Sequence, residues 1–231
     1  MHMPSPRRPF RIALAGLLIS AWAHAAPPLP AAQQAALDRA VADYQAGRHA
    51  AARVALQALA RQQVPAAQYD LAVMHLRAEV PRPSRAEAAR LLQAAARGGF
   101  VTAQFMWGQA LESGQFGLRD LGAAHQWYEL AAAAGSVPAQ LAMGTAHYLG
   151  RGRPQDAARA AHWYREAAKG GDEGAMYLLA AMYEQGDGVP RDARLARHWY
   201  AQAADQGDVA AKAKLAAWPQ ADSPAPATAP P

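Results

Sequence analysis

The sequence predicts an all-α protein, a solenoid of stacked helix–turn–helix units. Residues of the same type recur every 36 positions through the middle of the chain. Each interval holds two stretches with helical periodicity, which glycine and proline separate and which contain no β-branched run. A period of this length is typical of supersecondary units that bury their apolar faces by stacking on one another.

Five residue types mark the repeat: alanine, glycine, aspartate and an adjacent tryptophan–tyrosine pair. The recurring positions are Ala67, Ala103, Ala139, Ala175 and Ala211; Gly99, Gly135, Gly171 and Gly207; Asp120, Asp156 and Asp192; Trp127, Trp163 and Trp199; and Tyr128, Tyr164 and Tyr200. In the first unit Leu91 replaces the tryptophan and Ser84 replaces the aspartate. Ser84 is expected to form an S-x-x-E capping box with Glu87.

The unit that begins at Ala139 shows how each repeat is expected to fold. Its apolar positions lie on one face of a first helix, which ends at Gly150. Asp156 can cap the second helix by accepting a hydrogen bond from a free backbone N–H. That helix ends at Gly171, a residue that suits a left-handed C-terminal position.

The aromatic pairs are expected to contribute much of the stability. Each Trp–Tyr pair is predicted to fill the volume between one unit and the next. A buried side chain of this size removes about 150–250 Å² from water, so truncation of Trp163 is expected to cost about 3–5 kcal/mol.

The recurring positions predict how the chain is divided. The predicted segments are a signal peptide over residues 1–25, an N-terminal helical hairpin over 26–66, four repeats over 67–102, 103–138, 139–174 and 175–210, a C-capping helix over 211–218, and a tail over 219–231. Proline and alanine dominate the tail, a composition typical of disorder.

The first residues predict export. Arg7, Arg8 and Arg11 precede an apolar run over residues 12–23, and small residues stand before a cleavage point after Ala25. This order is that of a secretory signal peptide, and the apolar run is too short to span a bilayer comfortably. We therefore expect a periplasmic or secreted protein, cleaved near Ala25.

Composition excludes several kinds of site. The sequence has no cysteine, which excludes disulfides, thiolate metal sites and cysteine nucleophiles. Removal of residues 1–25 would leave 20 basic against 18 acidic residues, so the charge does not favour a nucleic-acid partner.

The unit from residue 139 resembles the Sel-one-like repeat (SLR), a relative of the tetratricopeptide repeat. The residues that carry the resemblance are Ala139-Gln140-Leu141-Ala142-Met143-Gly144, Gly150-Arg151-Gly152, Asp156, Trp163-Tyr164, Ala167-Ala168 and Gly171. Residues 31–63 are more similar to a tetratricopeptide hairpin, through Tyr44 and Gly47. The first SLR unit departs from the pattern because it lacks both loop glycines and the Trp–Tyr pair. The resemblance implies a right-handed α/α superhelix, a non-catalytic scaffold that is often exported to the periplasm or envelope.

The resemblance also implies that the first helix of each unit lines the concave face of the superhelix. The positions of these helices outside the core are the candidate partner-binding residues. They are Tyr69, Phe105, Gln109, Glu112, Leu141, Thr145, Tyr148, Tyr177 and Glu184. An aromatic and aliphatic ridge edged with carboxylates and amides suits an extended segment of a protein partner. The alternative is that the aromatic candidates pack between hairpins as core.

We expect no catalytic site, metal or cofactor. Histidines that share a register, such as His75 and His147, would lie at least about 10 Å apart in stacked hairpins, too far to converge on one metal ion. H-E-x-x-H, G-x-S-x-G and S-x-x-K are all absent from the sequence.

The leading functional prediction is a protein–protein interaction scaffold of the bacterial cell envelope. One alternative is a carbohydrate-binding module for peptidoglycan or exopolysaccharide, with Tyr69, Phe105, Tyr148 and Tyr177 as stacking platforms. A second is a β-lactam-binding or β-lactam-hydrolysing enzyme, which the missing S-x-x-K disfavours.

Overall fold

The computed structural model describes residues 28–117 and 119–218, and within these ranges the chain forms eleven α-helices and no strand. The helices are α1 (Ala31–Gln45), α2 (His49–Arg61), α3 (Pro65–Leu76), α4 (Arg85–Arg97), α5 (Val101–Ser113), α6 (Leu121–Ala133), α7 (Val137–Leu149), α8 (Ala157–Lys169), α9 (Glu173–Gln185), α10 (Ala193–Asp205) and α11 (Val209–Ala216). The expected signal peptide and the expected disordered tail lie outside the described residues.

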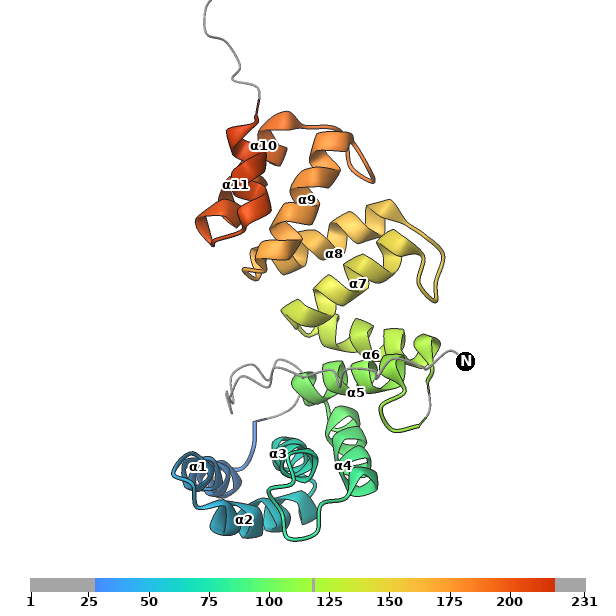
Figure 1. The fold of residues 1–231 in the computed structure, drawn as a ribbon. Coiled ribbons are helices and arrows are strands. Elements are labelled where there is room, and N and C mark those ends of the chain that lie inside the picture. Colours follow the sequence, from blue (N-terminus) through green and yellow to red (C-terminus); the bar gives the residue numbers. More distant parts are fainter. Residues whose placement is uncertain (1–27, 118, 219–231) are drawn as a thin grey trace, which may run out of the picture.

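The helices form five successive hairpins within the described ranges, from α1–α2 to α9–α10, and α11 packs on the last of them. Each helix contacts mainly the helix before it and the helix after it. The hairpins stack in chain order into a curved solenoid, from α1 at one end to α11 at the other (Figure 1). The predicted all-α solenoid is confirmed.

Aspartates begin the second helix of the last three hairpins. The Oδ1 atom of Asp120 accepts a hydrogen bond from the backbone N–H of Ala123 at 2.9 Å. Asp156 caps α8 in the same way at 2.9 Å, and Asp192 caps α10 by accepting hydrogen bonds from two backbone N–H groups, at 2.9 and 3.1 Å. These caps confirm the role predicted for the repeated aspartate, because each satisfies an N–H group that the first helical turn leaves free.

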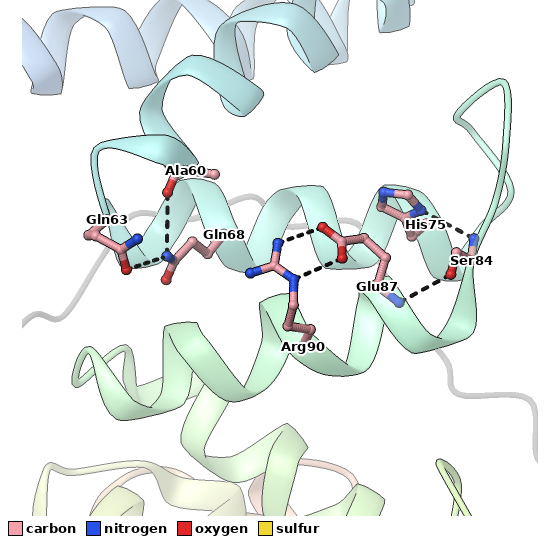
Figure 2. A network of polar contacts seen from close by, with 7 residues as sticks. All are labelled: Ala60, Gln63, Gln68, His75, Ser84, Glu87 and Arg90. Atoms are coloured by element: carbon pink, nitrogen blue, oxygen red, sulfur yellow. Dashed lines mark hydrogen bonds and ion pairs between the residues drawn. The ribbon is translucent and has the colours of Figure 1, made fainter.

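Ser84 makes only half of the predicted capping box. Its hydroxyl accepts a hydrogen bond from the backbone N–H of Glu87 at 3.1 Å. Its own N–H donates to Nδ1 of His75 at 3.2 Å, and the Glu87 carboxylate accepts two hydrogen bonds from Arg90, at 2.8 and 2.6 Å (Figure 2). The reciprocal bond was a wrong prediction, because Arg90 lies one turn further along α4 and engages the carboxylate.

The tyrosine of each Trp–Tyr pair is the buried member. Tyr128 and Tyr164 are each 2% exposed and Tyr200 is fully buried, whereas the tryptophans are only half-buried. Tyr164 packs inside its own hairpin, against Gly144 of α7. Trp163 instead packs against the core cluster that contains Tyr128 of the preceding hairpin. The prediction that both members fill the volume between units is therefore corrected: the tyrosine closes a hairpin and the tryptophan joins it to its neighbour.

Gly144→Ala is expected to lower the free energy of unfolding by about 1–3 kcal/mol, because overpacking forces a core side chain out of its position. A Cβ atom at Gly144 would lie 2.5 Å from Cδ1 of Tyr164. Ala180 occupies this register in the last hairpin, so the expected cost is the repacking of one ring rather than loss of the fold. Urea denaturation followed by circular dichroism measures the effect.

Gly174→Ala is the matched control for that substitution. Gly174 lies in the first turn of α9, where a Cβ atom would meet only Oδ1 of Asp172, at 3.3 Å. Alanine should be neutral or slightly stabilising there, because it reduces the entropy of the unfolded chain. Equal losses for the two variants would contradict the packing argument.

Candidate functional site

A groove of about 350 Å³ lies between α5, α6 and α7, and we refer to it as the α5–α7 groove. Four of the nine candidate partner-binding residues line it: Phe105 and Glu112 from α5, and Leu141 and Thr145 from α7. Phe105 and Leu141 occupy the same register of successive repeats. The stacking of two hairpins therefore brings together side chains that lie 36 positions apart in the sequence.

The apolar part of the groove rests on buried tyrosines. The Phe105 ring lies against Tyr128, with 5.5 Å between the ring centres. Thr145 donates a hydrogen bond to the backbone oxygen of Leu141 at 3.0 Å and accepts one from the Tyr164 hydroxyl at 3.3 Å. These contacts fix the side chains before any partner binds, which lowers the entropic cost of binding.

Glu112 provides a carboxylate whose geometry is fixed. The Tyr128 hydroxyl donates a hydrogen bond to Oε2 of Glu112 at 2.7 Å. Burial raises the pKa of Tyr128 well above that of a free phenol, and the hydrogen bond to Glu112 raises it further. The phenol therefore remains a proton donor, and Glu112 stays half-exposed in the groove.

Further polar groups border the same groove. His125 is 3% exposed, and burial together with the positive charge of Arg153 lowers its pKa, so its imidazole is neutral near pH 7. Arg151 is exposed, and Asp172 caps α9 through a 2.7 Å hydrogen bond from Ala175 N–H. The groove thus combines an apolar surface with groups of both charges.

The other five candidates lie outside the α5–α7 groove. The Tyr69 ring lies 5.1 Å from Phe100, that of Tyr148 6.5 Å from Tyr164, and that of Tyr177 5.2 Å from Tyr200. Glu184 accepts hydrogen bonds from Tyr200 and Lys214, whereas Gln109 is exposed on α5. The aromatic candidates are therefore half-buried against other rings, and only Phe105 among them lines the groove.

Several groove residues were not among the sequence-based candidates. They include Tyr128, which the register assigned to the core, and Arg151, which stands between two loop glycines expected only to form a turn. Tyr128 is indeed buried, and it also lines the groove. That surface forms only where α6 contacts both α5 and α7.

A second groove, of about 430 Å³, lies between α2, α3 and α4 and is mainly polar. Its side chains bind one another: the amide of Gln68 donates to Gln63 at 3.2 Å and to the backbone oxygen of Ala60 at 3.5 Å, beside the Glu87–Arg90 pair (Figure 2). The same contact recurs two repeats later, where the amide of Gln140 donates to the backbone oxygen of Ala132 at 3.2 Å. These glutamines join consecutive hairpins, so this groove is part of the scaffold.

Neither a cluster of metal ligands nor a membrane-spanning helix occurs in the residues that the structure describes. Within residues 28–117 and 119–218, no three side chains of His, Cys, Asp or Glu come together as metal ligands. No helix in the same ranges has both the length and the apolar character needed to cross a bilayer.

Comparison with known proteins gives a consistent family. The model of the Sel1 repeat, the repeat for which SLR proteins are named, matches residues 65–100, 101–136, 137–172 and 174–208, more than half of the chain. Sel1 repeat proteins are generally non-catalytic scaffolds for protein interactions. No curated protein matches the chain.

Two of the similar solved structures show the likeness well. A protective antigen present in uropathogenic Escherichia coli strains, which displays an SLR fold, is 30% identical over 79% of this chain, with a TM-score of 0.73. A Sel1 repeat protein from Oxalobacter formigenes is 34% identical over 72% of this chain, with a TM-score of 0.68. The chain covers 40% and 48% of the lengths of these two proteins. On the family match and these likenesses together, the chain belongs to the Sel1 repeat family.

Proposed function

We propose that this protein is a non-catalytic scaffold of the bacterial cell envelope that binds an extended segment of a partner protein in the α5–α7 groove. The observation that carries the proposal is the groove itself, where Phe105 and Leu141 form an apolar surface beside Glu112 and Arg151. A groove of about 350 Å³ accepts a few side chains of an extended segment rather than a folded surface. Gln109, exposed on α5 between Phe105 and Glu112, is proposed to contact the same segment.

The envelope location rests on the sequence. The basic residues, apolar run and small residues before position 26 have the order of a secretory signal peptide. We propose that the mature chain begins near Ala26 and meets its partner in the periplasm or outside the cell.

The double substitution Phe105→Ala and Leu141→Ala is expected to reduce partner capture at least about tenfold, because interface energy concentrates in a few apolar anchors. The measurement is affinity capture of envelope proteins on the immobilised mature protein, quantified by mass spectrometry. The matched control is Leu130→Ala with Leu195→Ala, which removes two exposed leucines that lie outside the groove.

Helical circular dichroism must first show that both double variants are folded, since Phe105 also packs against Tyr128. Capture that survives in the folded groove variant would place the binding surface elsewhere. Retention of purified peptidoglycan sacculi, with no protein captured, would favour the carbohydrate alternative instead.

A further inference from the structure

The last hairpin shows how a cation binds at one register of this fold. The Tyr200 hydroxyl donates a hydrogen bond to Oε2 of Glu184 at 2.8 Å. Lys214, which comes from α11, places its Nζ 3.0 and 2.9 Å from the two oxygens of that carboxylate and 5.8 Å from the centre of the Tyr200 ring. The helix after the hairpin thus supplies an ammonium group to a carboxylate–phenol pair.

The α5–α6 hairpin contains the same carboxylate–phenol pair. The Tyr128 hydroxyl donates to Glu112 at 2.7 Å, and an aromatic ring packs against the tyrosine in both hairpins, Phe105 at 5.5 Å and Tyr177 at 5.2 Å. The backbone oxygen of the glutamate is also held alike, since Arg119 and Arg191 each donate to it at 3.0 Å. The two sites are built from equivalent parts.

The two sites differ in the residue that the following helix places at the register of Lys214. The register of Lys214 is occupied by Ala142 in α7, and Ala142 lines the α5–α7 groove. An alanine is too short to reach Glu112. In the part of the chain that the structure describes, no basic side chain forms an ion pair with Glu112.

The remaining hairpins lack the carboxylate–phenol pair at these registers. In the α3–α4 hairpin the residues at the glutamate and tyrosine registers are Leu76 and Leu92, and the next helix supplies Met106, which packs against the cluster that contains Leu92. In the α7–α8 hairpin they are Tyr148 and Tyr164, and the next helix supplies Leu178 to the same cluster. In the α1–α2 hairpin the two residues are Ala40 and Leu56, and the next helix supplies Asp70. Of the two hairpins in the described residues that have a carboxylate–phenol pair at these registers, α5–α6 is therefore the one to which the next helix supplies no cation.

We propose that the α5–α7 groove binds the cationic side chain of a lysine or arginine in the partner segment, which takes at Glu112 and Tyr128 the position that Lys214 takes at Glu184 and Tyr200. This deepens the proposed function and rests on it. Hydrogen bonds between ionised groups are shorter and stronger than neutral ones, and a tyrosine face attracts a cation. Lys214 shows the effect within this molecule, because its hydrogen bond to Glu184 is the main cause of the lowered pKa of that carboxyl group.

The rest of the groove narrows the class of ligand. Arg151 also lines it, so a run of several basic residues would meet repulsion there. Phe105 and Leu141 favour apolar neighbours of the cationic residue. The expected ligand is a segment with one lysine or arginine beside apolar side chains.

A random library of displayed 12-residue peptides, selected on the immobilised mature protein, tests the proposal. The wild type should enrich peptides with one basic residue next to apolar residues. Glu112→Gln removes the charge but keeps an acceptor for the Tyr128 hydroxyl, and Ala142→Lys places an ammonium group where Lys214 has one; both variants should lose this enrichment. The control is Glu129→Gln, which removes an exposed charge on α6 outside the groove and should behave as the wild type.

The best enriched peptide is then synthesised with its basic residue and with norleucine in its place, an apolar side chain of similar length. Fluorescence anisotropy should show a dissociation constant about tenfold higher for the norleucine peptide on the wild type, and no difference between the two peptides on Glu112→Gln. Ala142→Lys should also raise the melting temperature by about 2–4 °C, and adding Glu112→Gln should cancel the gain.

Two other outcomes of the peptide selection would contradict one or both proposals. Enrichment of apolar peptides without a basic residue, equal on wild type and Glu112→Gln, would overturn the cationic ligand and leave the groove as the binding site. Failure of the folded wild type to enrich any peptide would count against the groove as a binding site and so against both proposals.

Discussion

Tyr164→Ala is expected to lower the free energy of unfolding by about 3–5 kcal/mol, the range for truncation of a large buried aromatic side chain. Tyr164 is 2% exposed, lies against Gly144 and belongs to a core cluster that spans α8, α9 and α10. Its position near the middle of the solenoid means that the cavity weakens contacts on both sides. Urea unfolding, followed by far-ultraviolet circular dichroism, gives both the midpoint and the slope of the transition, and a changed slope would reveal partial unfolding of the stack.

Two neighbouring substitutions make this prediction specific. Tyr164→Phe removes only a 3.3 Å hydrogen bond to Thr145 and should cost about 1 kcal/mol or less. Trp163→Ala removes a half-buried ring and should cost roughly 1–2 kcal/mol, below the range expected from the sequence alone. A larger loss for Trp163→Ala than for Tyr164→Ala would show that the core is organised around the tryptophan.

The sequence predicted the features that depend on neighbours along the chain. An aspartate such as Asp120 can cap a helix wherever it stands before the first turn. Gly150 ends α7 with a φ of 65°, a left-handed conformation that a residue without a Cβ atom adopts readily. These signals are local, so a single period of the repeat contains them. The repetition then predicted the stacking, since one hairpin cannot bury its own apolar face.

The features that the sequence did not predict depend on contacts between elements. Trp163 and Tyr164 are adjacent on a helix, so helical periodicity marks both as core, and only the approach of α7 at Gly144 selects the tyrosine for burial. The binding surface has the same origin. Phe105 and Leu141 line one groove because α6 contacts both α5 and α7, whereas Tyr177, which occupies their register in α9, lies outside it.

Asp70→Asn is expected to stabilise the protein above neutral pH. Asp70 lies in α3, is 9% exposed, and makes no hydrogen bond or ion pair within the described ranges. Burial raises the pKa of this carboxyl group from its usual 3.8 to about 7. The folded state therefore binds more protons than the unfolded state between these two values, so its stability falls as the pH rises from about 4 to about 7.

The expected result is a difference between two proteins that changes with pH. A shift of one pKa unit corresponds to about 1.4 kcal/mol, so the stability gained by Asp70→Asn should grow by about 2 kcal/mol from near pH 5 to near pH 8. His125 and His147 have pKa values that burial lowers, and they act in the opposite direction, because the unfolded state gains protons at these residues as the pH falls. Their contribution is common to both proteins and cancels in the difference.

Asp205→Asn provides the control for this comparison, because Asp205 is exposed at the end of α10. The gain that grows with pH should be absent for this variant, because the side chain of Asp205 lies at the surface of the folded protein. Asp70 occupies the register of Ala142 and Lys214. At this register, α3 therefore supplies a carboxylate to the preceding hairpin, α7 supplies a methyl group, and α11 supplies an ammonium group. If Asp70→Asn matched Asp205→Asn at every pH, the carboxylate would be solvated in the folded protein, and this register would face water at the first repeat instead of the neighbouring hairpin.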